Sequence, residues 1–133
     1  MVSNAERAGD LAVREALAGF MKGFEPLNAS VLASRLAPNV TAFLPFAPRR
    51  IEGREAVKAA FEHFFSGLSR ELPEPPSLRL VPERLEIQVI SGVAIASFEL
   101  EHQGSVGRRT LTFANQDGNW RIIHVHASEY ESS

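Results

Sequence analysis

The chain has 133 residues, of which 44% are hydrophobic. A chain of this length and composition usually forms one core, so we expect one globular domain over residues 1–133. It carries 14 basic and 16 acidic side chains, for a formal net charge of −2. Because nucleic-acid binding needs a basic face that displaces counterions from phosphates, this balance argues against a nucleic-acid partner. The absence of cysteine excludes disulfides, thiolate metal ligands and cysteine nucleophiles.

No targeting segment or membrane span is evident in the sequence. Charged residues interrupt the first 24 positions, where a signal peptide would have an uninterrupted apolar region. The longest uncharged stretch, residues 36–48, contains three prolines and is shorter than the roughly 20 residues of a spanning helix. We therefore expect a cytoplasmic protein with no membrane partner.

Two helices are predicted before residue 40. The first, over 3–23, opens with the capping-box pair Ser3 and Glu6, which satisfies amide groups at a helix start. Its apolar stripe consists of Val13, Leu17, Phe20 and Phe24. The second helix covers 29–36 and ends before Pro38. Its inward residues are expected to be Val31, Leu32 and Leu36.

A strand and a third helix are predicted next. A β-leaning run occupies 40–44 between two prolines, and Gly53 then opens a helix. The apolar residues of this helix show the clearest 3.6-residue period in the chain, and they are Val57, Phe61, Phe64, Phe65, Leu68 and Leu72. The proline-rich segment 73–76 then separates the helical half from the second half.

The second half of the sequence predicts four strands joined by short turns. Apolar and polar residues alternate over 78–90, 93–102, 108–114 and 120–128. The turn segments include 104–107 and the Asp117-Gly118 pair, which is the strongest hairpin signal. Helices followed by consecutive strands predict an α+β layer fold. We expect a twisted sheet that wraps around one long helix and forms a cone with an apolar opening.

Phenylalanine dominates the aromatic content, with nine residues against one tyrosine and one tryptophan. Several of these rings lie on two predicted helices and converge on one apolar volume, so they form core, an open pocket, or both. The predicted pocket residues are Phe20, Phe24, Phe43, Phe61, Phe65, Arg109 and Leu111. Such a pocket would bind a small apolar or mildly polar molecule.

Two histidines are candidates for chemistry. His124 and His126 lie two residues apart on a predicted strand, so their side chains share a face at a spacing of about 7 Å. They are candidates for acid–base catalysis, or for metal binding if a third ligand is near. The alternative is a structural role as hydrogen-bonded sheet residues. Because no second cluster of ligands is evident, we expect no metal and no cofactor.

Several segments resemble the SnoaL-like branch of the nuclear transport factor 2-like superfamily. These segments are Phe43-Leu44-Pro45, 51–57, 92–96, Arg108-Arg109-Thr110 and 117–128. The resemblance implies a curved antiparallel sheet packed on three N-terminal helices, and a homodimer formed through the open sheet face. The superfamily contains isomerases, polyketide cyclases, dehydratases and non-catalytic modules. Small-molecule binding, with or without catalysis, is our first hypothesis, and a non-catalytic association module is the alternative.

Positions at which the sequence departs from known members of the superfamily narrow the choice of function. Ketosteroid isomerases of this superfamily use an aspartate before a proline on the first strand and a tyrosine hydroxyl from the first helix. The matching residues here are Leu44 and Phe20 or Phe24, which supply neither a base nor a donor. The segment 117–128 also resembles the association domain of calcium/calmodulin-dependent protein kinase II. The cavity arginines of that domain match Glu99, Leu111 and Ala127, so its anion pocket does not carry over.

Glu99 is the remaining catalytic candidate, and its strand has two possible orientations. The family alignment turns Glu99 into the cone, where burial favours a general base. The opposite face of the strand is more apolar, which would turn Glu99 outward, and composition does not decide between the two. Arg108 and Arg109 point to opposite faces, where one of them would pair with Glu99 or Glu101 or hold an anionic group.

Overall fold

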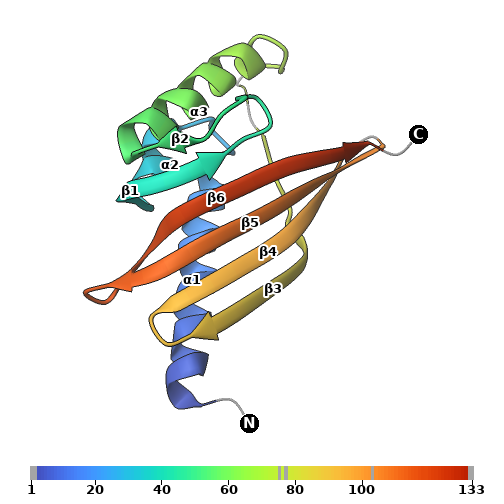
Figure 1. The fold of residues 1–133 in the computed structure, drawn as a ribbon. Coiled ribbons are helices and arrows are strands. Elements are labelled where there is room, and N and C mark those ends of the chain that lie inside the picture. The colour runs from blue at the N-terminus through green and yellow to red at the C-terminus, as the bar shows by residue number, and fades with distance from the viewer. Residues whose placement is uncertain (1–2, 75, 77, 103, 132–133) are drawn as a thin grey trace.

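The computed structural model describes residues 3–74, 76, 78–102 and 104–131. Within these residues, helices pack on one face of a six-stranded sheet whose opposite face carries no helix (Figure 1). The helices are α1 (Asn4–Lys22), α2 (Ala29–Ala33) and α3 (Arg54–Ser69). The strands are β1 (Leu36–Phe43), β2 (Ile51–Glu52), β3 (Glu83–Ile90), β4 (Val93–His102), β5 (Ser105–Gln116) and β6 (Asn119–Glu131). The α+β class and the helices on a curved sheet are therefore confirmed.

The sheet has the strand order β2-β1-β6-β5-β4-β3. Strands β3 to β6 form the predicted antiparallel meander, while β1 pairs with β6 in parallel. The sheet is thus mixed rather than purely antiparallel. The parallel contact joins segments far apart in sequence, such as Thr41 and His124, so no local turn signal announces it. None of the helices in the described part of the chain is long and apolar enough to cross a bilayer.

The helix starts follow from their capping residues. The Ser3 hydroxyl accepts a hydrogen bond from the Glu6 amide at 3.1 Å, which confirms the predicted start of α1. Gly53 precedes α3 with a φ of 93°, a conformation that glycine adopts without strain. The prediction that the second helix extends to residue 36 is wrong. The helix ends at Ala33 because the backbone that follows pairs with β6, where the Ile122 amide donates a hydrogen bond to the Arg35 carbonyl.

Several further boundaries differ from prediction. Val31 is exposed rather than inward, since α2 is too short to bury a full stripe. Strand β3 begins at Glu83 instead of residue 78, and β5 begins at Ser105, within a predicted turn. Ser105 pairs with both His102 and Glu131, so ladder hydrogen bonds extend the strand past its local turn residues. The Asp117-Gly118 hairpin is confirmed, with φ angles of 54° and 87°.

The core lies between the helices and the sheet face that they cover. It contains Val13, Leu17 and Phe20 from α1, Val57, Phe61 and Phe65 from α3, and Ala94, Ala96, Phe98, Leu111, Phe113, Ile122 and Val125 from the sheet. Among the described residues no polar or charged side chain is buried with them. The helices therefore dock chiefly through hydrocarbon contacts, and polar groups lie at the margins or on the open sheet face.

Candidate functional site

An aromatic cluster occupies the interior between α1 and α3. Phe20, Phe24, Phe61 and Phe65 are all buried, and most of their rings meet edge to face at centroid distances of 5.6 to 6.5 Å. This geometry is the favourable one for aromatic pairs. Leu111 is buried on the sheet side of the same core. Five of the seven predicted pocket residues therefore come together in the interior.

A cleft of about 460 Å³ opens next to this cluster, between α2 and α3. Phe65 contributes to its wall, so one ring of the buried cluster meets the cleft. Glu62, Ser66 and Ser69 of α3 add polar groups to the same wall. These three residues were missed from sequence. Their spacing from Phe65 carries the signal, because positions 62, 65, 66 and 69 share one face of a helix.

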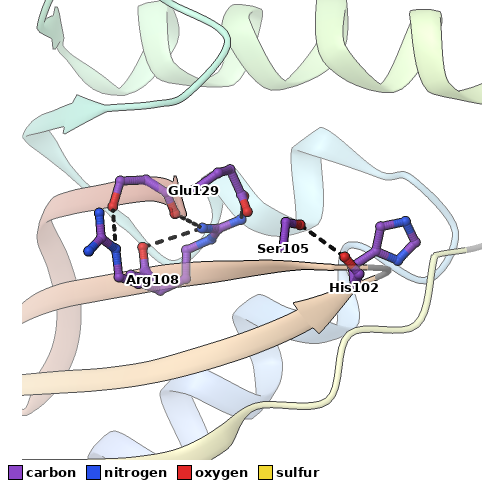
Figure 2. Close-up of polar contacts among 6 residues, drawn as sticks. His102, Ser105, Arg108 and Glu129 are labelled. Atoms are coloured by element: carbon purple, nitrogen blue, oxygen red, sulfur yellow. Dashed lines mark hydrogen bonds and ion pairs between the residues drawn. The ribbon is translucent and has the colours of Figure 1, made fainter. Parts of the chain in front are cut away.

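Arg109 lies on the helix-covered side of the sheet, two positions before Leu111 on β5. Its guanidinium is held by the neighbouring strand: Nη1 donates to the Ser128 carbonyl at 3.1 Å, and Nη2 donates to Glu129 at 2.9 Å (Figure 2). Gly107 leaves room for this pair, since a Cβ there would lie 3.0 Å from Arg109 Nη1 and 3.2 Å from Glu129 Oε2. Arg109 is thus engaged within the chain.

The carboxylate partner of Arg109 is Glu129, so the expected partners Glu99 and Glu101 are wrong for this residue. Arg109 is aligned with Ala127 of β6, and Glu129 lies two residues further on the same face. Glu99 belongs to the opposite face, where its side chain is 43% exposed and lies 3.7 Å from Arg84. Arg108 also points to that face, where it donates to Ser128 Oγ.

The open sheet face contains the other predicted site residues. One row of cross-strand neighbours runs over five strands and consists of Gln88, Ile95, Thr112, His124 and Thr41. The adjacent row consists of Glu86, Ser97, Thr110, His126 and Phe43. Directly paired residues share a face. Phe43 therefore lies with the histidines, its ring centroid 5.8 Å from that of His124 and 5.6 Å from that of His126. It does not join the interior cluster.

The two sheet faces thus separate the predicted site residues. The candidate catalytic residues Glu99, His124 and His126 share the open face with Phe43, while the remaining pocket residues lie on the covered face. The even-numbered residues of β4 pack against the helices, which turns Glu99 away from the interior. The catalytic roles of these three residues stay predictions. Among the described residues, no group of three or more histidine or acidic side chains is placed to hold a metal ion.

His124 has the clearest electrostatic environment on the open face. Its Nδ1 and the Thr41 hydroxyl form a hydrogen bond of 2.7 Å. Burial lowers the pKa of His124 below its ordinary value of 6.5, and the charges of His126 and Arg50 act in the same direction. A hydrogen bond with the backbone of Thr41 raises this pKa and opposes them. The net shift favours the neutral imidazole in the folded protein.

We expect the free energy of unfolding to decrease as the pH falls below 6.5 because of His124. With the folded pKa lowered, the unfolded chain binds more protons between the two pKa values, so stability rises with pH in that window. The contribution is complete above pH 6.5 and is lost as the pH falls toward the folded pKa. Urea unfolding at pH 7.5 and pH 5.0 measures it.

The variant His124→Gln should reduce the difference in stability between these two pH values. His63→Gln removes an exposed histidine from α3 and is the matched control. If both variants retain the difference found in the unchanged protein, His124 is not its source.

Comparison with known proteins identifies the superfamily and the family to which this architecture belongs. Helices packed on one face of a curved mixed sheet are the architecture of the nuclear transport factor 2-like class, and the SnoaL-like domain model matches residues 13–131. The chain therefore belongs to the SnoaL-like family of that superfamily, as its sequence segments indicated. No curated protein sequence matches the chain significantly.

Solved structures of the superfamily are similar to this chain at low sequence identity. An NTF2-like protein of unknown function from Pseudomonas putida is 20% identical, with a TM-score of 0.75 over 92% of this chain and 87% of that one. A candidate dehydratase from Streptomyces avermitilis is 14% identical, with a TM-score of 0.79 over 95% and 99% of the two chains. A candidate ketosteroid isomerase from Parabacteroides distasonis is 20% identical, with a TM-score of 0.64 over 86% and 84%. These similarities establish the fold.

Proposed function

We propose that this SnoaL-like domain binds a small apolar or mildly polar molecule in the cleft between α2 and α3. The observation that carries the proposal is the position of Phe65, which belongs to the buried aromatic cluster and also to the wall of the cleft. The volume of about 460 Å³ falls in the range of small-molecule sites. Its lining combines apolar residues, among them Leu27, Ala29 and Phe65, with polar side chains, which suits a small ligand that has both apolar and polar groups.

The polar groups of the cleft would orient the ligand. The Ser69 hydroxyl donates to the Ser66 carbonyl, and the Asn28 side chain caps α2, so both are engaged within the chain. Glu62 forms no ion pair with any described residue. It is therefore free to accept a hydrogen bond from a ligand hydroxyl or amine. Similarity to a candidate dehydratase and a candidate ketosteroid isomerase supports a small-molecule ligand and leaves the reaction open.

Filling the cleft tests the proposal. Ser66→Phe places a ring in the cleft from an exposed position of α3, without replacing a core residue. We expect it to weaken binding of the apolar probe 1-anilinonaphthalene-8-sulfonate by about tenfold or more, since a blocked pocket forfeits most of its contact area. Fluorescence titration of the folded protein measures the affinity.

His63→Phe adds the same ring to α3 at an exposed position outside the cleft, and it should bind the probe as the unchanged protein does. Equal affinities of Ser66→Phe and the unchanged protein would contradict the assignment of the cleft. Thermal unfolding of each variant shows whether a change in fluorescence comes from lost structure.

We also propose that a second copy of the chain covers the open sheet face, giving a homodimer. The specific observation is that exposed apolar side chains, including Phe43, Val93 and Ile95, share this face with threonines and the two histidines. A twofold contact brings the same surface together from both copies, so it needs a surface complementary to itself. From β4 to β1 the two rows consist of apolar, hydroxyl and histidine side chains, and their one carboxylate, Glu86, lies at the β3 edge of the sheet.

A further inference from the structure

We infer that a second, separate cleft binds a phosphate group, either as the free ion or as the monoester of a small molecule. This cleft has a volume of about 280 Å³ and lies between α1, the segment preceding β1, and the β5–β6 hairpin. Two arginines, Arg35 and Arg121, contribute to its lining. It shares no lining residue with the cleft between α2 and α3, so it does not depend on the function proposed above.

The parallel pairing of β1 with β6 brings the two arginines together. Leu36 is aligned with Ile122, so the preceding residues, Arg35 and Arg121, lie side by side where the pairing begins. The Ile122 amide donates to the Arg35 carbonyl at 2.9 Å and fixes this alignment. Adjacent strands are about 4.8 Å apart, so two positive side chains start from neighbouring backbone positions.

The described residues supply no carboxylate partner for this pair. The ion pairs among them involve Arg14, Arg50, Arg84 and Arg109, and neither Arg35 nor Arg121 takes part in one. Like charges at neighbouring backbone positions repel each other. An anion between or beside them would remove that repulsion, and guanidinium groups bind phosphate oxygens through paired hydrogen bonds.

Both arginines are positioned by contacts within the chain. Arg121 Nη1 donates to the Ser34 carbonyl at 3.3 Å. The Arg35 guanidinium lies against Gly19 of α1, where a Cβ would come within 2.5 Å of Nη2. The absence of a side chain at Gly19 therefore provides the space that Arg35 occupies beside the cleft.

The remaining lining completes the electrostatic description. Asn119 adds an amide that donates hydrogen bonds, and Trp120 adds an indole ring. Glu15 is the acidic residue among those that line the cleft, and it leaves a net formal charge of +1. Because Glu15 would repel a bound phosphate, its removal should strengthen binding, whereas loss of either arginine should weaken it.

The single tryptophan of the sequence, Trp120, provides the readout. Inorganic phosphate is titrated into the folded chain while Trp120 fluorescence is recorded, and a saturable change is expected. Arg35→Gln and Arg121→Gln should each weaken the affinity about tenfold or more, as for loss of a charged hydrogen bond. Glu15→Gln should strengthen it by a few-fold, and Gly19→Ala should weaken it by displacing Arg35 without changing the charge.

Arg7→Gln removes an exposed arginine of α1 outside the cleft and is the control for net charge. A response that does not saturate, or that Arg7→Gln weakens as much as Arg35→Gln, would overturn the inference. Thermal unfolding of Gly19→Ala shows whether the variant is damaged or only displaces Arg35. Because alanine favours a helix over glycine, an undamaged variant should unfold at a temperature no lower than that of the unchanged protein. Tighter binding of glycerol 3-phosphate than of inorganic phosphate assigns the cleft to a monoester, and the reverse order assigns it to the free ion.

Discussion

Replacing Phe61 with alanine is expected to lower the free energy of unfolding by about 3–5 kcal/mol, the range for truncating a buried phenylalanine. The Phe61 side chain is 4% exposed and lies at the centre of the aromatic cluster. Its ring centroid lies 6.5 Å from that of Phe20, 5.8 Å from Phe24, 5.9 Å from Phe65 and 6.0 Å from Phe46. Truncation would remove contacts with Phe20 of α1 and with Phe65 of its own helix, α3. Urea unfolding measures the loss of stability.

Phe46→Ala is the matched comparison for this experiment. The Phe46 ring stacks on Phe64 at 4.7 Å and also contacts Phe61, yet its side chain is 39% exposed. Because much of its surface is already in water, its removal should cost clearly less than the removal of Phe61. A cost for Phe46→Ala equal to or above that for Phe61→Ala would contradict the central position assigned to Phe61.

The variant Ile95→Arg is expected to dissociate the proposed homodimer, with an increase in dissociation constant of about 100-fold or more. Ile95 lies in the row that crosses the middle of the open sheet face, and its side chain is 37% exposed in the isolated chain. In a twofold contact a charge at this position would be desolvated in both copies. Sedimentation equilibrium over a dilution series measures the constant.

Leu11→Arg serves as the control for added charge, because Leu11 is 65% exposed on α1, away from the open face. It should leave the association unchanged. An unchanged protein that sediments as a monomer, or an Ile95→Arg variant that associates as strongly as Leu11→Arg, would contradict the interface. A ring larger than a dimer would instead favour the non-catalytic association module over the ligand-binding protein.

Local features of the sequence determined much of the fold. The capping residue Ser3, the period of the third helix and the turn at Asp117-Gly118 each act within a few residues, so they can be recognised without knowledge of contacts. The SnoaL-like segments went beyond these local elements and identified the family. They did not locate the cleft residues on α3, whose spacing on one helix face becomes informative only when α2 lies opposite them.

The orientation of the strands was decided by tertiary structure alone. Both faces of β4 contain apolar residues, so its sequence could not say which face the helices cover, and therefore could not place Glu99. The parallel pairing of β1 with β6 joins distant segments through backbone hydrogen bonds, which carry no side-chain signature. That pairing places Thr41 beside His124 and Arg35 beside Arg121. Local sequence patterns and the SnoaL-like segments thus determined the fold class and the family, whereas long-range strand pairing determined which polar residues meet.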